Sequence, residues 1–102
     1  MEWRVEVRFV VFGGEPAPNG PFSTLLHRLE MYGALGSIDA EGWMIELTVP
    51  AVGATGAIIK AEILASSGAL EVGLPQSEVI RIIAERTAAF GAISNPVGEL
   101  GG

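Results

Sequence analysis

The first part of the chain alternates between apolar and polar residues. From Trp3 onward every second residue is apolar, and the residues between them are at first charged. A period of two places the two sets on opposite faces of a β-strand. The second set becomes apolar at Val10 and Phe12, and Gly13 then interrupts the pattern. We therefore predict a half-buried strand from Trp3 to Phe12.

The next pattern repeats every three to four residues. Pro21 suits the first turn of a helix, and apolar residues follow at the spacing of one helical face, at Phe22, Leu25, Leu26 and Leu29. We predict an amphipathic helix that ends near Gly33. His27 falls outside the apolar stripe, and a single histidine on the solvent side of a helix most often has no role in a site.

Two shorter alternating runs meet at Glu41 and Gly42. Their arrangement around an Xaa-Gly pair predicts a β-hairpin that turns at these two residues. Three carboxylates lie close together in this stretch, at Asp39, Glu41 and Glu46. General acid–base chemistry needs carboxylates positioned beside a substrate. Alternate strand positions with no second catalytic group favour an ordinary solvated face instead.

A second helical pattern begins after the segment VPAVGATG. We predict a helix from about Gly56 to Ser67, capped by Thr55, with a core face formed by Ala57, Ile58, Ala61, Leu64 and Ala65. Ile59 and Ile63 fall on the opposite side of this helix. Large apolar residues on a solvent-facing side are either an interface or simply tolerated there.

The last alternating run extends from Ser77 to Arg86 and predicts a final strand. Before it, we expect the segment GALEVGLPQ to form a loop or a weak edge segment. After it, residues 87–102 contain glycine, proline and few charges, which is typical of a loose tail. The predicted domain therefore covers residues 1–86.

The predicted order is strand, helix, strand, strand, helix, strand. Two right-handed crossovers in a chain this short give an α+β, ferredoxin-like βαββαβ sandwich, in which a four-stranded antiparallel sheet carries two helices on one face. The first and third strands are central in this topology, and the other face of the sheet is uncovered.

The uncovered face mixes charged and apolar side chains, as protein interfaces do. The alternative is a solvated sheet with cross-strand Arg–Glu pairs, each contributing a few tenths of a kcal/mol. With the outer side of the second helix, this face supplies the predicted interface residues: Arg8, Val10, Phe12, Met44, Glu46, Ile59, Ile63, Val79, Arg81 and Ile83.

The composition excludes several kinds of site. The 102 residues include no cysteine and one histidine, which excludes disulfides, Cys-based zinc sites and His-pair metal sites. The net charge of −6 opposes binding to a phosphate backbone, and no apolar stretch approaches the roughly 20 residues that span a bilayer. We predict a cytoplasmic protein without catalytic, cofactor-binding or metal-binding residues, and without direct contact to nucleic acid or membrane.

Four passages carry a resemblance to known proteins: WRVEVRFVV, SIDAEGW, ELTVPAVGATGAIIKAE and LPQSEVIRIIAERTAA. Through them, residues 3–87 resemble small actinobacterial and actinophage ferredoxin-like domains, which in many proteins precede a helix-turn-helix segment. The resemblance implies the fold and an interaction or oligomerisation role, and it brings no catalytic residues. The sequence after Glu85 lacks a helix-turn-helix pattern, so we expect no DNA-binding role.

Several functions remain open at this point. We expect first a non-enzymatic interaction module that binds a second copy of itself, as a homodimer, or another protein. One alternative is a regulatory domain similar to ACT domains, with its ligand loop at NGPFSTLL. A cofactor-free enzyme on a dimeric sheet would need His27 and a carboxylate. The final Leu100, Gly101 and Gly102 are similar to the diglycine of sulfur carriers, although those folds begin with a hairpin.

Overall fold

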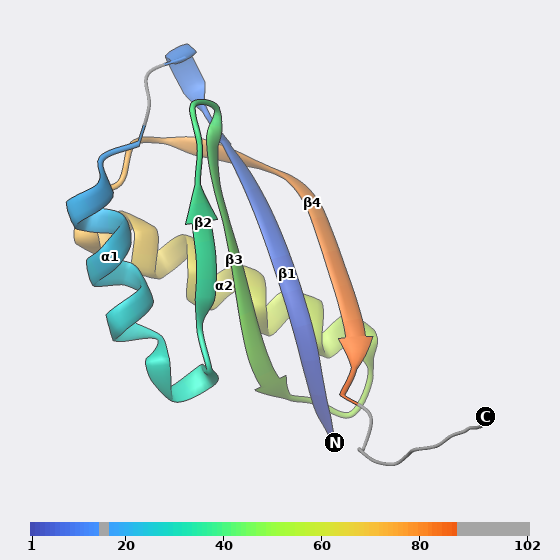
Figure 1. Cartoon of the computed structure of the whole chain (residues 1–102). Helices are drawn as coiled ribbons and strands as arrows, with labels where there is room; N and C mark the ends of the chain where they lie inside the picture. Colours follow the sequence, from blue (N-terminus) through green and yellow to red (C-terminus); the bar gives the residue numbers. More distant parts are fainter. Residues whose placement is uncertain (15–16, 88–102) are drawn as a thin grey trace.

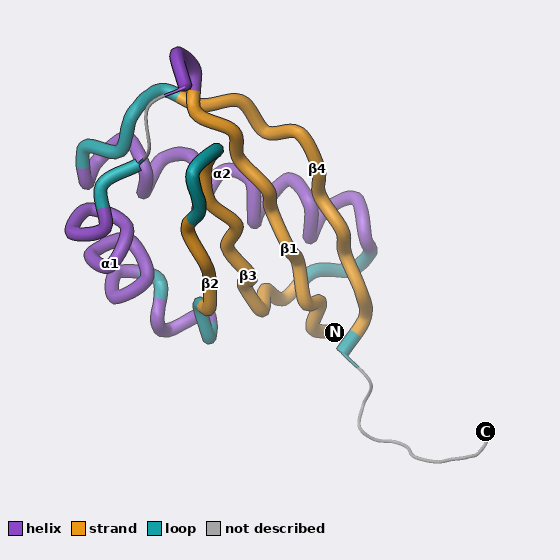
Figure 2. The backbone as a smooth tube through the Cα atoms, turned by 45° about the horizontal axis from the view of Figure 1, so that its top comes forward, coloured by secondary structure: helices purple, strands orange, loops and turns teal. Residues whose placement is uncertain are grey.

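The computed structural model describes residues 1–14 and 17–87 (Figure 1). Its elements are, in chain order, β1 (Glu2–Val11), the 3-10 helix η1 (Phe12–Gly14), α1 (Asn19–Arg28), the 3-10 helix η2 (Glu30–Tyr32), β2 (Leu35–Ile38), β3 (Gly42–Pro50), α2 (Ala54–Val72) and β4 (Ser77–Arg86). The strands form one antiparallel sheet in the order β2-β3-β1-β4. Both helices lie on the same side of it (Figure 1, Figure 2). The predicted ferredoxin-like fold is confirmed, with the first and third strands in the centre.

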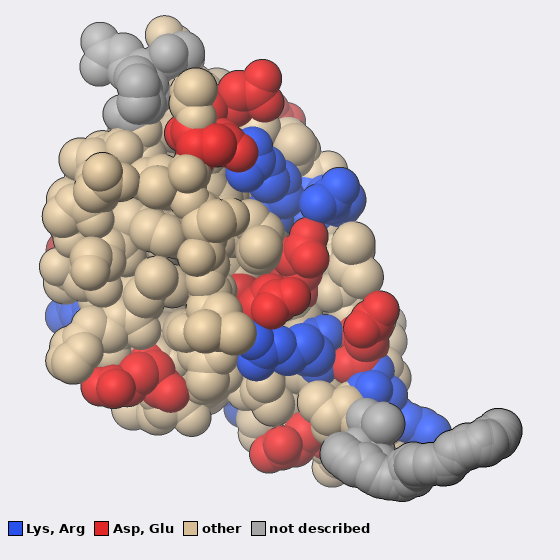
Figure 3. All heavy atoms as spheres, in the orientation of Figure 1, with Lys and Arg blue, Asp and Glu red and all other residues tan. Residues whose placement is uncertain are grey.

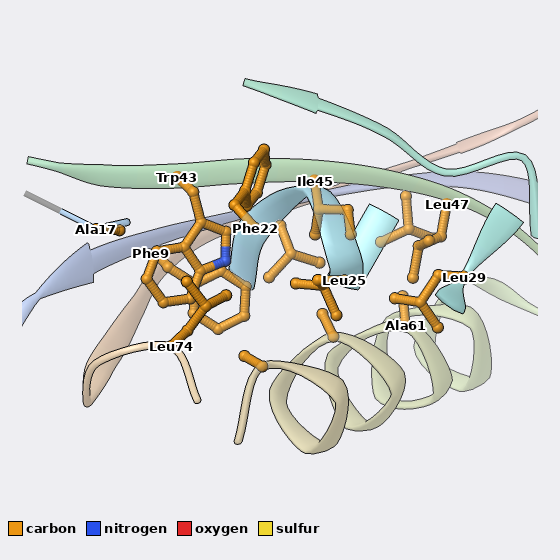
Figure 4. Close-up of a cluster of buried hydrophobic side chains, with 14 of the residues drawn as sticks. Phe9, Ala17, Phe22, Leu25, Leu29, Trp43, Ile45, Leu47, Ala61 and Leu74 are labelled. Atoms are coloured by element: carbon orange, nitrogen blue, oxygen red, sulfur yellow. The ribbon is translucent and has the colours of Figure 1, made fainter. Parts of the chain in front are cut away.

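The core lies between the sheet and the helices. Alternate residues of β1 from Val5 to Val11 are buried, and β3 contributes Trp43, Ile45, Leu47 and Val49. Phe9 and Trp43 lie opposite each other in register, and their rings stack with centroids 4.9 Å apart. Helix α1 packs onto these residues with the large side chains of Phe22, Leu25 and Leu29 (Figure 4).

Helix α2 meets the core with small residues. Its buried positions are Ala57, Ala61, Ala65, Gly68 and Ala69. A Cβ atom at Gly68 would lie 2.6 Å from Cδ1 of Leu25. The absence of a side chain at Gly68 therefore allows α1 and α2 to pack this closely.

The predicted boundaries of this helix are wrong at both ends. The helix continues through the segment that we expected to be a loop and ends at Gly73, whose φ of 85° is the left-handed conformation that glycine favours. The N–H of Leu74 donates to the carbonyl of Ala69 at 3.0 Å and closes this end. At the other end Gly53 is the N-cap and Thr55 lies inside the first turn. The expected loop began at Gly68. This glycine instead lies inside the helix, at a site of close packing against Leu25.

The predicted first helix divides into two pieces. Helix α1 ends at Arg28, Leu29 has non-helical backbone angles, and the 3-10 helix η2 follows. The left-handed Gly33, with φ of 64°, ends this segment as predicted.

The hairpin turn lies one residue earlier than predicted. The N–H of Asp39 donates to the carbonyl of Gly42 at 2.9 Å, so Ala40 and Glu41 occupy the corner. The Asp39 carboxylate oxygen Oδ1 accepts the N–H groups of Glu41 and Gly42 at 2.8 and 3.0 Å. Aspartate often fixes a turn in this way.

A bulge in β4 changes the direction of two side chains. Arg8 lies opposite Arg81, whereas Phe9 lies opposite Val79, so Ile80 is an extra residue on β4. Val79 consequently packs against the core. Ile80 is 55% exposed. The sequence analysis placed Val79 on the uncovered face, and this placement is wrong.

Thr87, the residue after the predicted domain, still pairs with β1. The N–H of Thr87 donates to the carbonyl of Glu2 at 3.1 Å and extends the β1–β4 pairing. The remainder of the predicted tail, residues 88–102, lies outside the described residues, and so does the diglycine at Gly101 and Gly102.

Candidate interaction surface

The side of the sheet away from the helices is called the open face below. The strand registers place fifteen side chains on it: Leu35 and Ser37 of β2, Met44, Glu46, Thr48 and Pro50 of β3, Glu2, Arg4, Glu6, Arg8 and Val10 of β1, and Glu78, Arg81, Ile83 and Glu85 of β4. Because β1 and β3 are central, the open face is continuous across all four strands.

Like charges lie directly opposite each other on the open face. Glu6 of β1 is in register with Glu46 of β3. Arg8 is in register with Arg81 of β4. Such pairs destabilise a sheet, but each charge finds an opposite charge among other neighbours: Arg4 pairs with Glu46 at 3.0 Å, Arg81 with Glu6 at 2.9 Å, and Arg8 with Asp39 at 2.9 Å. The Arg–Glu cross-strand pairs that the sequence analysis expected for the alternative, a solvated sheet, are therefore present.

The hairpin turn joins this charge network. The backbone N–H of Glu41 donates to the Asp39 carboxylate and, with the N–H of Gly42 and the guanidinium of Arg8, lowers the pKa of Asp39 despite an opposing desolvation effect. Only 15% of the Arg8 side chain is exposed. The three clustered carboxylates are thus turn and ion-pair groups, since Glu46 is bound by Arg4.

Apolar groups lie between and beside the ion pairs. Leu35 is 61% exposed and Ile83 is 42% exposed. Met44 and Val10 are half-buried on the same face. Figure 3 shows acidic and basic side chains alternating over β1 and β4, while the half over α1 and β2 is nearly free of charge. The open face therefore combines a charged half, whose three arginines are all ion-paired, with an uncharged half.

The structure brings together most of the predicted interface residues but not all. Arg8, Val10, Met44, Glu46, Arg81 and Ile83 share the open face. Val79 faces the core, and Phe12 lies in η1 beyond the end of β1, where it is 55% exposed. Ile59 and Ile63 lie on α2, on the other side of the molecule, and are 53% and 59% exposed.

Leu35 was missed by the sequence analysis. Strand β2 has only four residues, and its inward positions are Gly36, opposite Ile45, and Ile38, opposite Trp43. The glycine at position 36 conceals the alternation in the part of the strand that contains Leu35. The pairing of Leu35 with Glu46 places it on the open face.

A cavity of about 220 Å³ lies at one end of the core. It is lined by the Phe9–Trp43 stack, by Ala69 and Leu70 near the end of α2, and by the loop that leads into β4. The indole nitrogen of Trp43 is buried and is the one buried side-chain nitrogen or oxygen within the described chain that has no hydrogen-bond partner. We call this space the end cavity.

The other features considered from the sequence are a histidine, a metal site and a membrane-spanning helix. The His27 side chain is 82% exposed, with Nδ1 3.5 Å from the Glu30 carboxylate, and it does not line the end cavity. Among residues 1–14 and 17–87, no three His, Asp or Glu residues are grouped so that they could hold a metal ion. In the same residues, no helix is both long enough and apolar enough to cross a membrane.

Comparison of the chain with protein-family models, with curated proteins and with solved structures gives no match.

Proposed function

We propose that this protein is a non-enzymatic interaction module that binds a partner protein through its open face. The observation that carries the proposal is the exposure of Leu35 and Ile83 on a sheet that has helices on one side only. Exposed apolar groups within a polar surround are typical of protein-binding surfaces.

The charge network supports this reading of the open face. Arg4, Arg8 and Arg81 are each paired within the chain. A partner therefore need not neutralise these arginines. Most of the binding free energy would then come from burial of the apolar side chains between them. Charged groups of this kind contribute more to the choice of partner than to affinity.

The test compares two exposed regions. The double variant Leu35→Glu/Ile83→Glu and the control Val52→Glu are used as baits for affinity capture from the native host. Val52 is 98% exposed and lies in the loop between β3 and α2, away from the open face. We expect the wild type and Val52→Glu to capture the same protein and the double variant to lose it. Identical capture by all three folded baits contradicts the proposal.

A second candidate is a small-ligand regulatory domain, and the end cavity with its unpaired Trp43 favours it. At about 220 Å³ the cavity is smaller than the roughly 300–1,000 Å³ of sites for drug-sized molecules. It suits a ligand the size of an amino acid. It lies at the end of α2 and β4, and none of its lining residues belongs to the predicted loop NGPFSTLL at the start of α1.

A thermal-shift screen with amino acids at millimolar concentration tests this second candidate. A ligand at about 100 times its Kd adds roughly 2.7 kcal/mol to the free energy of unfolding. A matching loss of that shift in Leu74→Trp, which fills the cavity, would support the assignment. No shift with any amino acid counts against it.

A further inference from the structure

The outer side of α2 carries an apolar stripe. Ile59, Ile63 and Leu70 are 53%, 59% and 80% exposed. At 100° per residue these three positions fall within about 40° of one another on the helix. Their mean direction is opposite to that of the buried Ala61 and Ala65. We call Ile59, Ile63, Ser66 and Leu70 the outer stripe.

A helix that is apolar on both sides is normally buried on both sides. In this protein the sheet and α1 cover only the alanine side of α2. The outer stripe is mostly uncovered by the described residues, because its three large side chains are all more than half exposed. Only its margins meet other elements, where Ile63 borders Leu29 and where Leu70 borders the end cavity. The outer stripe therefore lacks the second contact surface that its composition indicates.

The charges beside the outer stripe are arranged for an antiparallel copy of the same helix. Lys60 and Glu71 are eleven residues apart and so lie on the same flank of α2, Lys60 in the first half of the helix and Glu71 beside its last residue. In an antiparallel pair related by a two-fold axis, equal flanks face each other, because the rotation exchanges the two ends. Lys60 of each copy is then brought beside Glu71 of the other.

The apolar positions match in the same register. With the two-fold axis between Ile63 and Ser66, Ile59 of one copy lies opposite Leu70 of the other. Ile63 then lies opposite Ser66, whose small side chain leaves room for it. Within the described residues Lys60 forms no ion pair, while Glu71 is paired with Arg28 of α1. A carboxylate oxygen pair accepts a second cation without losing the first.

We propose that a second copy of this chain docks on the outer stripe, with the two α2 helices antiparallel. The proposal rests on the stripe and its flanking charges and is independent of the partner assigned to the open face. It predicts a homodimer with two equivalent Lys60–Glu71 pairs.

The first experiment measures mass by light scattering over a concentration series. We expect the wild type and Val52→Glu to dimerise equally, and Ile63→Glu to raise the dissociation constant at least tenfold with an unchanged circular dichroism spectrum. A wild type that stays monomeric at every concentration overturns the proposal. So does a dimer that Ile63→Glu leaves intact and Ile83→Glu dissociates, since that result assigns the second copy to the open face.

The second experiment exchanges the charges. Lys60→Glu and Glu71→Lys should each weaken the dimer when present alone, because each creates two like-charge contacts. When the two variants are mixed, both contacts in the mixed dimer regain opposite charges. We expect native mass spectrometry to find mixed dimers well above the twofold ratio to either homodimer that random pairing of the two chains gives. A random distribution of the three species, in which mixed dimers are only twice as abundant as either homodimer, overturns the antiparallel register.

Discussion

The two helices cover the same sheet, but they distribute their apolar side chains in opposite ways. Helix α1 buries large residues, among them Phe22 and Leu25, and exposes polar ones such as Ser23 and His27. Helix α2 buries alanine and glycine and exposes the large residues of the outer stripe.

This difference separates two uses of hydrophobic residues. In α1 the large side chains fill the core, so the helix is complete within one chain. In α2 the inner small residues allow close packing against the sheet and α1, Leu64 and Val72 pack beside them, and the large residues of the outer stripe lie away from the core. Folding explains the apolar content of the inner side of α2, and the proposed association would explain that of the outer side.

The largest effect should separate the inner side of α1 from the outer side of α2. Leu25 is fully buried, so Leu25→Ala should lower the free energy of unfolding by about 3 kcal/mol. Ile63→Ala, measured at a concentration where the protein is monomeric, should change it by less than about 0.5 kcal/mol. Denaturant unfolding measures both. Comparable losses for the two variants would contradict the division between core and association surface.

The next effect concerns the close crossing of the helices. Gly68→Leu should lower stability by about 2 kcal/mol, because the new side chain overlaps Leu25. Ser67→Leu is the matched control at an exposed position of the same helix. In a Leu25→Ala background the cost of Gly68→Leu should shrink by at least about 1 kcal/mol, since the space has been cleared. If Gly68→Leu is equally destabilising in the Leu25→Ala background, the new side chain does not clash with Leu25.

A smaller effect is expected from the ion pair between Arg28 of α1 and Glu71 of α2. Both side chains are about half exposed or more, at 49% and 64%. Arg28→Met should therefore cost only a few tenths of a kcal/mol, and less at high salt. Arg86→Met removes an exposed arginine charge far from the helix crossing and serves as control. A loss above about 1 kcal/mol would mean that charge, and not packing, holds the helices together.

The smallest effect is expected at Asp39 in the hairpin turn. It concerns the dependence of stability on pH and does not involve the packing of the helices. The pKa of Asp39 is lower in the folded chain than its ordinary value of 3.8, mainly through the N–H of Glu41. The ionised Asp39 therefore stabilises the folded chain at pH values above the pKa that Asp39 has in the unfolded chain. This stabilisation is lost as the pH falls through the lower pKa of the folded chain. When unfolding is measured at about pH 5 and at about pH 2, Asp39→Asn should lose less free energy of unfolding between the two than the wild type does. An acid sensitivity equal to that of the wild type would exclude Asp39 as a source.

Periodicity in the sequence was sufficient to predict the architecture. The long alternating runs identify β1, β3 and β4 as strands, because residues that point into the core are apolar, and the ferredoxin-like topology predicted that β1 and β3 are central. The 3.6-residue period around Leu25 identified α1, and the glycine at position 33 marked the end of the helical segment that continues after α1 as η2. These are local signals, and they do not depend on what lies across the core.

The remaining features depend on contacts between distant residues. The role of Gly68 is set by Leu25, which lies in another helix, and the register shift at Ile80 is set by β1. The open-face ion pairs follow from diagonal neighbours that register alone does not select. Leu35 was hidden because Gly36 occupies the inward position beside Phe22.

With the helices on one side of the sheet only, two chains joined along α2 carry their open faces on opposite outer surfaces. Such an assembly is bivalent. A partner that presents two matching sites would bind the second one at a high effective concentration, which raises overall affinity by about 10² to 10⁴ without any new contact. In that setting a change at Ile63 would weaken partner binding although it lies on the opposite side of the protein from the open face.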